Sequence, residues 1–214
     1  VEEFYCPNET VEKQREYKQG ILEGIETTYY SNGNKAYEGE FFLGQRIGKW
    51  IWYHAQTEDV IKESFFENGS GNWYVFNEEG ILREESYYNK GVLSGEHKTF
   101  YENLTLKVKD RYLHGVLSGL QEEFSQNGTL IKKKIWEKGV PNSNYVLSFG
   151  NGRKKQEGKF VGSLVAGQYF RWYDNGMKKT EGSWKFGVRH GQWIWFNRDG
   201  SLKGEKRFFY GMEL

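Results

Sequence analysis

Aromatic and glycine positions recur along this chain at a spacing of about 24 residues. Each repeat begins at a lead position, and seven of the eight lead residues are Gly24, Gly48, Gly71, Gly95, Gly119, Gly167 and Gly191. Ser143 fills the remaining place. The residue 17 positions after every lead is aromatic, from Phe41 through Phe65 to Phe208. A second column, five positions after the lead, is aromatic except at Ser148, and a looser third column lies two positions after it. This regular spacing predicts a repeat protein.

Two kinds of turn punctuate each repeat. Asn-Gly or Asp-Gly pairs such as Asn32-Gly33 and Asp199-Gly200 follow most lead positions, and they predict type I′ hairpin turns because both residues tolerate positive φ. A glycine 20 positions after most leads, as in Lys90-Gly91, marks a second bend. Each unit is therefore expected to contain two strands of about 5–7 residues. Glycine interrupts the pattern too often for helices.

These elements predict an all-β fold, an elongated single-layer antiparallel meander of about eight to nine tandem β-hairpins. Residues 24–214 hold eight repeats, and residues 1–23 form a degenerate N-terminal repeat that keeps Tyr5, Tyr17 and Gly20 at the corresponding places. We expect one continuous array. A compact barrel is the alternative, but equal spacing without a long crossover favours the linear meander.

The aromatic columns have two interpretations. Stacked rings can form the core of such small units, since each buried ring removes roughly 150–250 Å² from water. Alternatively, one column faces outward as a binding stripe, and Trp172, Trp193 and Trp195 are the candidate partner-binding residues.

Charge is balanced overall but divided along the chain. The formal net charge is +1, yet residues 1–100 hold 10 Lys+Arg against 18 Asp+Glu, and residues 101–214 hold 20 against 11. A Lys/Arg column runs 12 positions after the lead beside a Glu column two positions further on, which predicts a neutralised, solvated face. Positive charge is expected to be uncompensated at Lys132, Lys133 and Lys134. Together with Arg153, Lys154 and Lys155 one unit later, these residues are the candidate patch facing anions or lipid.

Candidate chemistry is sparse. The four histidines do not occur at metal-ligand spacing, Cys6 is the only cysteine, and no nucleophile, phosphate-loop or zinc-protease motif occurs. We therefore predict no enzymatic activity, no metal site and no cofactor. The balanced net charge argues against nucleic acid as a partner, and no apolar run reaches the roughly 18 residues of a membrane span. Because the chain starts at Val1, we expect a processed or truncated N-terminus, with export to the periplasm or a cytoplasmic location as alternatives.

Two segments carry a family pattern. Residues 37–53 read YEGEFFLGQRIGKWIWY and residues 180–196 read TEGSWKFGVRHGQWIWF. They resemble MORN repeats, and the wider unit is similar to the bacterial MORN-variant class. The resemblance implies a single-layer sheet of hairpins. It also implies scaffold or membrane-proximal roles, as in eukaryotic relatives, or an antitoxin or immunity grouping, as in bacterial ones.

The leading functional hypothesis is a non-catalytic protein-binding scaffold. The first alternative is a peripheral array that binds anionic phospholipid through the basic stretch at 132–155. The second is a toxin-neutralising immunity protein, which is a special case of protein binding.

Overall fold

The computed structural model describes residues 1–5 and 11–214, so Cys6 lies outside the described residues. This part of the chain forms β-strands joined by tight turns and contains no helix. The predicted all-β meander of tandem antiparallel hairpins is confirmed. The chain divides into two compact units, Val1–Leu104 and Thr105–Leu214.

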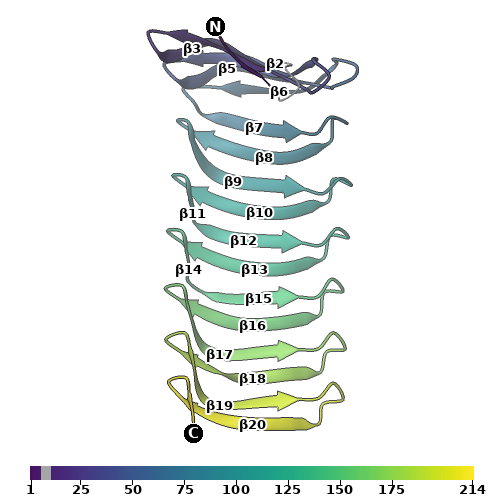
Figure 1. The fold of residues 1–214 in the computed structure, drawn as a ribbon, viewed down its shortest axis with the longest axis vertical. Helices are drawn as coiled ribbons and strands as arrows, with labels where there is room; N and C mark the ends of the chain where they lie inside the picture. The colour runs from purple at the N-terminus through teal and green to yellow at the C-terminus, as the bar shows by residue number, and fades with distance from the viewer. Residues whose placement is uncertain (6–10) are drawn as a thin grey trace. The chain divides into compact units, whose positions relative to one another are not determined.

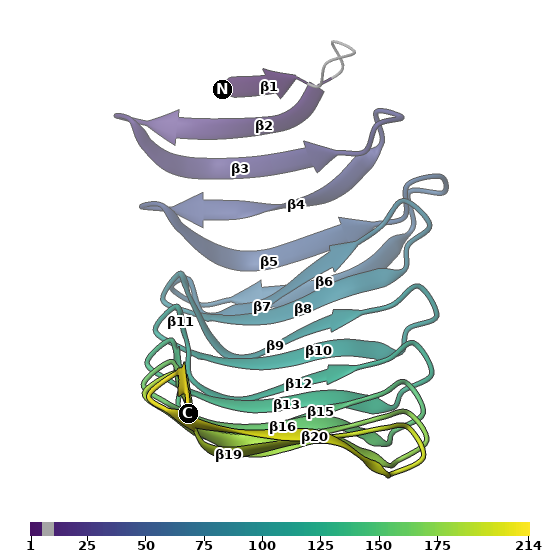
Figure 2. The same cartoon turned by 60° about the horizontal axis from the view of Figure 1, so that its bottom comes forward.

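In the first unit, six strands form one sheet in chain order (Figure 2): β1 (Glu2–Tyr5), β2 (Val11–Lys18), β3 (Ile21–Tyr29), β4 (Lys35–Phe42), β5 (Gln45–Tyr53) and β6 (Val60–Phe66). Three further strands pair with one another in order: β7 (Gly71–Phe76), β8 (Leu82–Asn89) and β9 (Val92–Phe100).

The second unit continues the pattern of hairpins (Figure 1). Its long strands pair in chain order and are β10 (Leu106–Leu113), β12 (Gly119–Phe124), β13 (Leu130–Glu137), β15 (Asn144–Ser148), β16 (Lys154–Val161), β17 (Leu164–Trp172), β18 (Lys178–Lys185), β19 (Val188–Phe196) and β20 (Leu202–Phe209). Three two-residue strands, β11 (Val116–Leu117), β14 (Val140–Pro141) and β21 (Met212–Glu213), pair with β10, β13 and β20. Many strands have 8 or 9 residues, which is longer than expected.

The prediction of type I′ turns at the Asn-Gly pairs is wrong. After β3, the Tyr30 amide donates to the Asn34 carbonyl (2.8 Å) and the Gly33 amide donates to the Tyr30 carbonyl (3.0 Å). Only Gly33 in this loop has a positive φ, at 87°. The loop is therefore a type I turn followed by a glycine in the left-handed region. Asn32 contributes through its side chain, whose Oδ1 accepts the Asn34 amide at 3.0 Å.

Type I′ turns instead close the opposite end of each hairpin. Leu43 and Gly44 have φ values of 49° and 75°, and the flanking residues Phe42 and Gln45 pair directly. Both turn residues also have positive φ at Gln19-Gly20, Asn68-Gly69, Lys90-Gly91, His114-Gly115, Lys138-Gly139, Phe186-Gly187 and Tyr210-Gly211. In several repeats the turn glycine also donates its amide to a carbonyl one repeat earlier, so consecutive turns are linked along one edge.

The two faces of each sheet carry different aromatic columns. Trp50, two positions after its lead, is fully buried and packs edge-on against Phe41 at a ring distance of 5.3 Å. Tyr53 lies on the opposite face, where its hydroxyl donates to Glu38 at 2.5 Å. The core therefore uses the columns two and 17 positions after the lead.

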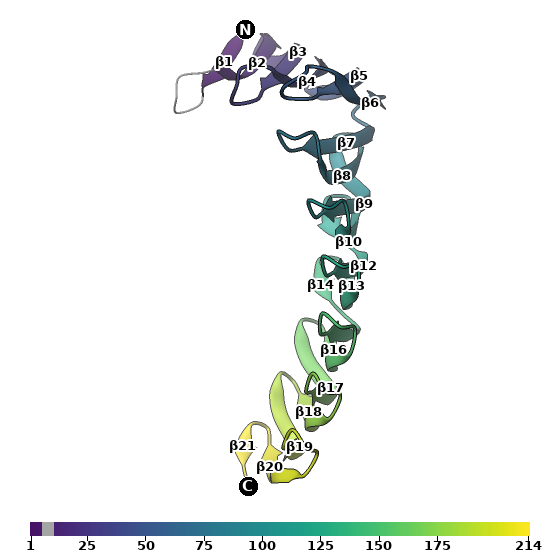
Figure 3. The ribbon, with the colours of Figure 1, turned by 90° about the vertical axis from the view of Figure 1, so that its right-hand side faces the viewer.

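The hydrogen-bonded ladder is interrupted between β6 and β7, where the bridge joins only Glu67 and Ser70. Four positions separate the turn glycine Gly44 from the next lead, Gly48, but only two separate Gly69 from Gly71. The strand that should follow the turn is therefore too short to continue the pairing, and β7 and β8 turn away from the sheet of β1–β6 (Figure 3).

The interrupted repeat also shifts its aromatic residue. The loop after β5 closes between His54 and Asp59, one residue longer than the loop after β3. As a result Phe66 pairs with the lead Gly48 and is 1% exposed, whereas Phe65 is 70% exposed. The prediction that Phe65 continues the core column is therefore wrong.

A half-buried arginine lies against the core of the first unit. The Arg46 guanidinium carbon lies 4.2 Å from the Trp73 ring centroid, and it also lies within 6 Å of the rings of Phe41, Trp50, Phe66 and Tyr88. Burial lowers the pKa of Arg46. These rings come from both sides of the interrupted ladder, so the second group of strands covers the first.

Candidate functional site

The three predicted tryptophans lie on two different faces of the second unit. Trp193 and Trp195 alternate along β19 and share one face, with their ring centroids 6.2 Å apart. Trp172 lies on the other face, 5.9 Å from Phe170 on the same strand. The structure therefore brings two of the three together and separates the third.

Trp193 is part of the core. It is 2% exposed, its Nε1 donates to the Ser183 carbonyl at 3.1 Å, and its ring covers Gly182 so closely that an added Cβ would lie 2.4 Å from Trp193 Cδ2. The Arg189 guanidinium carbon lies 4.9 Å from the Trp193 ring centroid. Trp195 is half-buried beside it and has more surface available for a partner.

The predicted basic stretch on β13 also divides between faces. Lys132 and Lys134 share one face, and Lys133 lies on the other. Lys132 forms an ion pair with Glu123, and Lys133 Nζ lies 3.8 Å from Glu122 on the neighbouring strand. The expectation of uncompensated charge is therefore wrong for these two lysines. Burial, and then repulsion from Lys132, lowers the pKa of Lys134, whose Nζ lies 5.3 Å from the Phe160 ring centroid.

The second basic stretch makes mostly local contacts. Arg153 donates to the Asp174 carbonyl at 3.1 Å, and Lys154 Nζ lies 2.7 Å from Glu157. Lys154 also lies over Trp172, at 5.6 Å from the ring centroid, and Lys155 lies 5.7 Å from the Phe149 ring. An anion-binding role for these residues stays a prediction.

The charge ladder differs in detail from the predicted one. The Glu column pairs with the lysine three positions before it, at Lys35–Glu38, Lys154–Glu157 and Lys178–Glu181. A shift in the strand register explains this choice, because Trp172 pairs with Lys178 and Arg171 pairs with Thr180. Lys179 is the extra residue of this bulge, and its Nζ lies 5.1 Å from the Tyr173 ring instead.

The division of charge coincides with the boundary between the two units. Residues 1–104 hold 10 Lys+Arg and 19 Asp+Glu, and residues 105–214 hold 20 and 10. The first unit thus has a net charge of −9 and the second has +10. Such opposite fields favour partners of opposite charge for the two units.

Sequence reasoning missed an exposed apolar surface along the type I′ turns of the second unit. We name this surface the turn-edge patch, and its residues are Leu164 (50% exposed), Phe186 (69%), Val188 (37%), Phe209 (51%) and Tyr210 (41%). The rings of Phe186 and Tyr210 are stacked with centroids 6.4 Å apart, and Lys185 Nζ lies 5.0 Å from the Tyr210 ring. The available signal was the presence of Phe and Tyr before a turn glycine.

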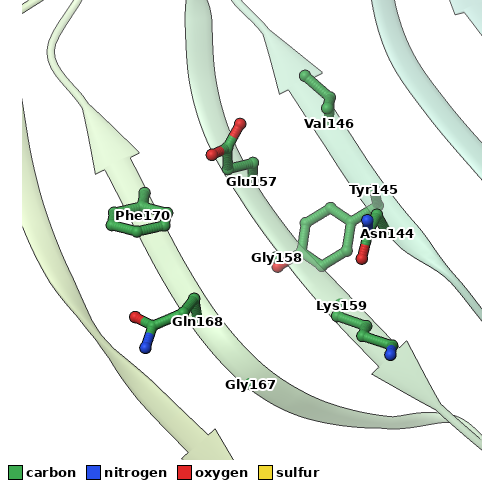
Figure 4. Close-up of a pocket in the computed structure, with 9 residues that line it drawn as sticks. All are labelled: Asn144, Tyr145, Val146, Glu157, Gly158, Lys159, Gly167, Gln168 and Phe170. Carbon is green, nitrogen blue, oxygen red and sulfur yellow. The ribbon is translucent and has the colours of Figure 1, made fainter.

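A shallow depression of about 340 Å³ lies on β15–β17, on the face that also carries Phe170 and Trp172. Figure 4 shows Glu157, Lys159, Gln168 and Phe170 spread along neighbouring strands, not converging on one point. The carboxylate of Glu157 is held by Lys154. This depression does not assemble a nucleophile with a base among its lining residues.

The described residues also bear on metal binding and on membrane insertion. Among residues 1–5 and 11–214, no three His, Cys, Asp or Glu side chains are grouped so as to hold a metal ion. Within the same ranges, no helix has the length and apolar character required to cross a membrane.

Comparisons with known proteins agree with this architecture. The family model for the MORN repeat variant matches residues 22–42 and 189–209, and these two matches support a MORN repeat protein. MORN repeats are generally associated with protein or membrane-lipid interaction. A comparison with curated proteins found no match. The bacterial antitoxin-like grouping stays a prediction.

Proposed function

We propose that this chain is a non-catalytic interaction scaffold, and that a protein partner docks on the turn-edge patch of the second unit. The observation that carries the proposal is the pair Phe186 and Tyr210. Both are exposed, and both occupy the first place of a type I′ turn, with φ values of 52° and 48°.

Neither local structure nor burial explains two aromatic residues at these places. The first position of a type I′ turn favours Asn, Asp or Gly, because other side chains are strained at positive φ. Strain of this kind is ordinarily offset by packing, but 69% of Phe186 remains exposed. A ring that is disfavoured by its turn and left in solvent is typical of a residue that serves an interface.

The surroundings indicate the chemistry of the partner. Lys185 lies beside the patch, with its Nζ 6.0 Å from the Phe186 ring centroid, and the patch belongs to the unit with a net charge of +10. The expected partner therefore presents an apolar centre with acidic side chains around it. The half-buried Trp195 lies on the other face of β19 from Val188 and is not part of this patch.

The test compares capture by three forms of the chain from lysate and envelope fractions of the source cell. The double variant Phe186→Gln/Tyr210→Gln should lose at least about tenfold of one stoichiometric protein relative to the unaltered chain, because truncating two interface aromatics removes several kcal/mol of binding. Gln19 already occupies the same turn position at φ 52°, so glutamine fits this backbone.

Leu43→Gln is the matched control, because Leu43 has the same turn position, a φ of 49° and 59% exposure in the first unit. This variant should retain the partner. Equal capture by the double variant would refute the turn-edge patch as the docking surface. Recovery of anionic lipid without protein would instead favour the membrane array, and a toxin as partner would identify the immunity role.

A further inference from the structure

A cavity of about 270 Å³ lies in the first unit beside the interruption between β6 and β7. Six aromatic side chains form most of its wall, namely Tyr30, Tyr37, Trp52, Trp73, Tyr74 and Phe76. The two other lining residues are Ala36 and Val75, so no charged side chain lines the cavity. Its volume is slightly below that of typical sites for whole small molecules, and it suits a single functional group.

The rings are fixed by one another. Trp73 meets Tyr37 edge-on at a centroid distance of 4.9 Å and Trp52 at 5.1 Å. Tyr74 meets Trp52 at 5.5 Å with the ring planes 89° apart. The Tyr30 hydroxyl is used in a hydrogen bond to the Tyr53 carbonyl at 2.9 Å, which anchors that ring at the rim. The wall is therefore preorganised and needs little ordering when a ligand enters.

Electron-rich ring faces on several sides attract a cation. Rings of this cluster already hold cationic groups of the protein, since Arg46 lies 4.2 Å from the Trp73 centroid and Lys62 Nζ lies 4.6 Å from the Tyr74 centroid. The surrounding unit has a net charge of −9. Glu78 lies at the rim, where its Oε1 accepts the Ser31 hydroxyl at 2.8 Å. Charge and ring arrangement therefore both favour a positively charged ligand.

The lack of charged groups in the wall distinguishes between kinds of cation. A primary ammonium or a guanidinium would lose its hydrogen bonds to water without a carboxylate to replace them. A quaternary ammonium has no N–H group and loses none. We propose that this cavity binds the trimethylammonium group of a choline-type ligand, supplied either by free choline or by a phosphatidylcholine headgroup. The site lies in the first unit and is independent of the turn-edge patch.

The first experiment uses the unaltered chain and titrates it with choline and with 3,3-dimethyl-1-butanol, a neutral molecule of the same shape, while tryptophan fluorescence is recorded. Choline should bind at least about tenfold more tightly, because only the cation gains from the ring faces. Equal affinity for the neutral molecule would overturn the proposal, as would the lack of a choline response at tens of millimolar. No folding defect can affect this comparison.

Variants then locate the site. Tyr30→Ala and Phe76→Ala should each weaken choline binding about tenfold. Tyr173→Ala is the matched control, because Tyr173 occupies the same repeat position and donates an equivalent hydrogen bond to the Phe196 carbonyl at 3.0 Å, but lies in the other unit. A loss of choline binding in Tyr173→Ala equal to that in Tyr30→Ala would place the ligand elsewhere and overturn the assignment.

Vesicles distinguish the two sources of the ligand. Sedimentation with phosphatidylcholine vesicles that is abolished by free choline supports a headgroup ligand, whereas choline binding without sedimentation supports the free molecule. Sedimentation that choline does not compete away would overturn the assignment of this cavity.

Discussion

The same repeat positions create an enclosed core in the first unit and an open one in the second. Trp50 and Trp193 both lie across a glycine of the preceding strand, and Arg46 and Arg189 both lie over the resulting ring cluster. Arg46 is surrounded by five rings, because β7 and β8 add Trp73 and Tyr88. Arg189 contacts three rings and remains exposed.

This difference shows that the environment of a repeat residue depends on what covers its face. The two arginines occupy equivalent places in their repeats, 22 positions after the lead. The link between Gly69 and Gly71 in the first unit is shortened, and β7 and β8 do not continue the ladder of β1–β6. These strands instead cover the rings. A change in chain length at one turn therefore converts an exposed cation–π contact into a half-buried one surrounded by more rings.

The largest expected effect comes from adding a methyl group at the glycine that lies under each tryptophan. A Cβ at Gly39 would lie 2.1 Å from Trp50 Cδ2, and one at Gly182 would lie 2.4 Å from Trp193 Cδ2. Gly39→Ala should lower the free energy of unfolding by about 3 kcal/mol and Gly182→Ala by about 2 kcal/mol, because the covered Trp50 has less room to shift. Urea denaturation measures both.

Gly204→Ala is the control for both glycines. No heavy atom lies within 4 Å of a Cβ added there, and its φ is not positive, so the change should stay within about 0.5 kcal/mol. Equal losses at Gly39 and Gly182 would contradict the idea that the covering strands make the first core less adaptable.

Truncation of the two arginines tests the same comparison directly. Arg46→Ala removes a side chain from the centre of five rings and should destabilise by about 2–3 kcal/mol, because it leaves a cavity. Arg189→Ala should cost about 0.5–1 kcal/mol, as expected for an exposed cation–π contact. Thermal unfolding measures the loss of stability in each variant. A larger loss in Arg189→Ala than in Arg46→Ala would contradict the comparison.

A smaller effect is expected from a carboxylate of the first unit at acidic pH. Burial alone would raise the pKa of Glu38, but hydrogen bonds from Lys35 and Tyr53 outweigh it and lower that pKa. Stability from such a group is present at neutral pH and is lost as pH falls through the lowered pKa of the folded state. Glu38→Gln should therefore cost about 1 kcal/mol at pH 7 and flatten the loss of stability below about pH 4.

Glu205→Gln gives the comparison for this carboxylate in the second unit, because Glu205 occupies the same repeat position but has Gln192 as its hydrogen-bond partner. Urea midpoints are measured from pH 7 to pH 3 for both variants and for the unaltered chain. The midpoints of Glu205→Gln should differ less from those of the unaltered chain than the midpoints of Glu38→Gln do. An equally steep acid dependence in Glu38→Gln and the unaltered chain would argue against this role for Glu38.

The smallest expected effect is a gain in stability. Phe186→Asn should raise the free energy of unfolding by about 0.5 kcal/mol, because asparagine tolerates the positive φ of this turn better than phenylalanine does. Leu43→Asn should give a similar gain in the first unit. Chemical denaturation detects both, and a loss of stability in Phe186→Asn would mean that the ring supports the fold, contrary to a role in binding.

Part of the candidate surface could be predicted from sequence and part could not. The sequence proposed Trp172, Trp193 and Trp195 together as candidate binding residues, but strand alternation places only Trp193 and Trp195 on one face. The pairing of Lys132 with Glu123 depends on strand register, which a one-residue bulge changes. The exposure of Phe186 was only weakly signalled by an aromatic residue before a turn glycine, because the residue at that place shows no consistent polarity from repeat to repeat.

By itself the sequence determined the repeat, the hairpins and the places of the turns, because glycine and aromatic residues recur at positions that only this backbone accommodates. It did not determine which turn is type I′, since both ends of the hairpin contain a glycine, and the loop length decides how many residues need positive φ. Only the tertiary structure decided that Phe66 replaces Phe65 in the core and that Arg46 is enclosed. Both outcomes arise from the added and lost residues around β6, whose effects on register and pairing extend beyond any single repeat.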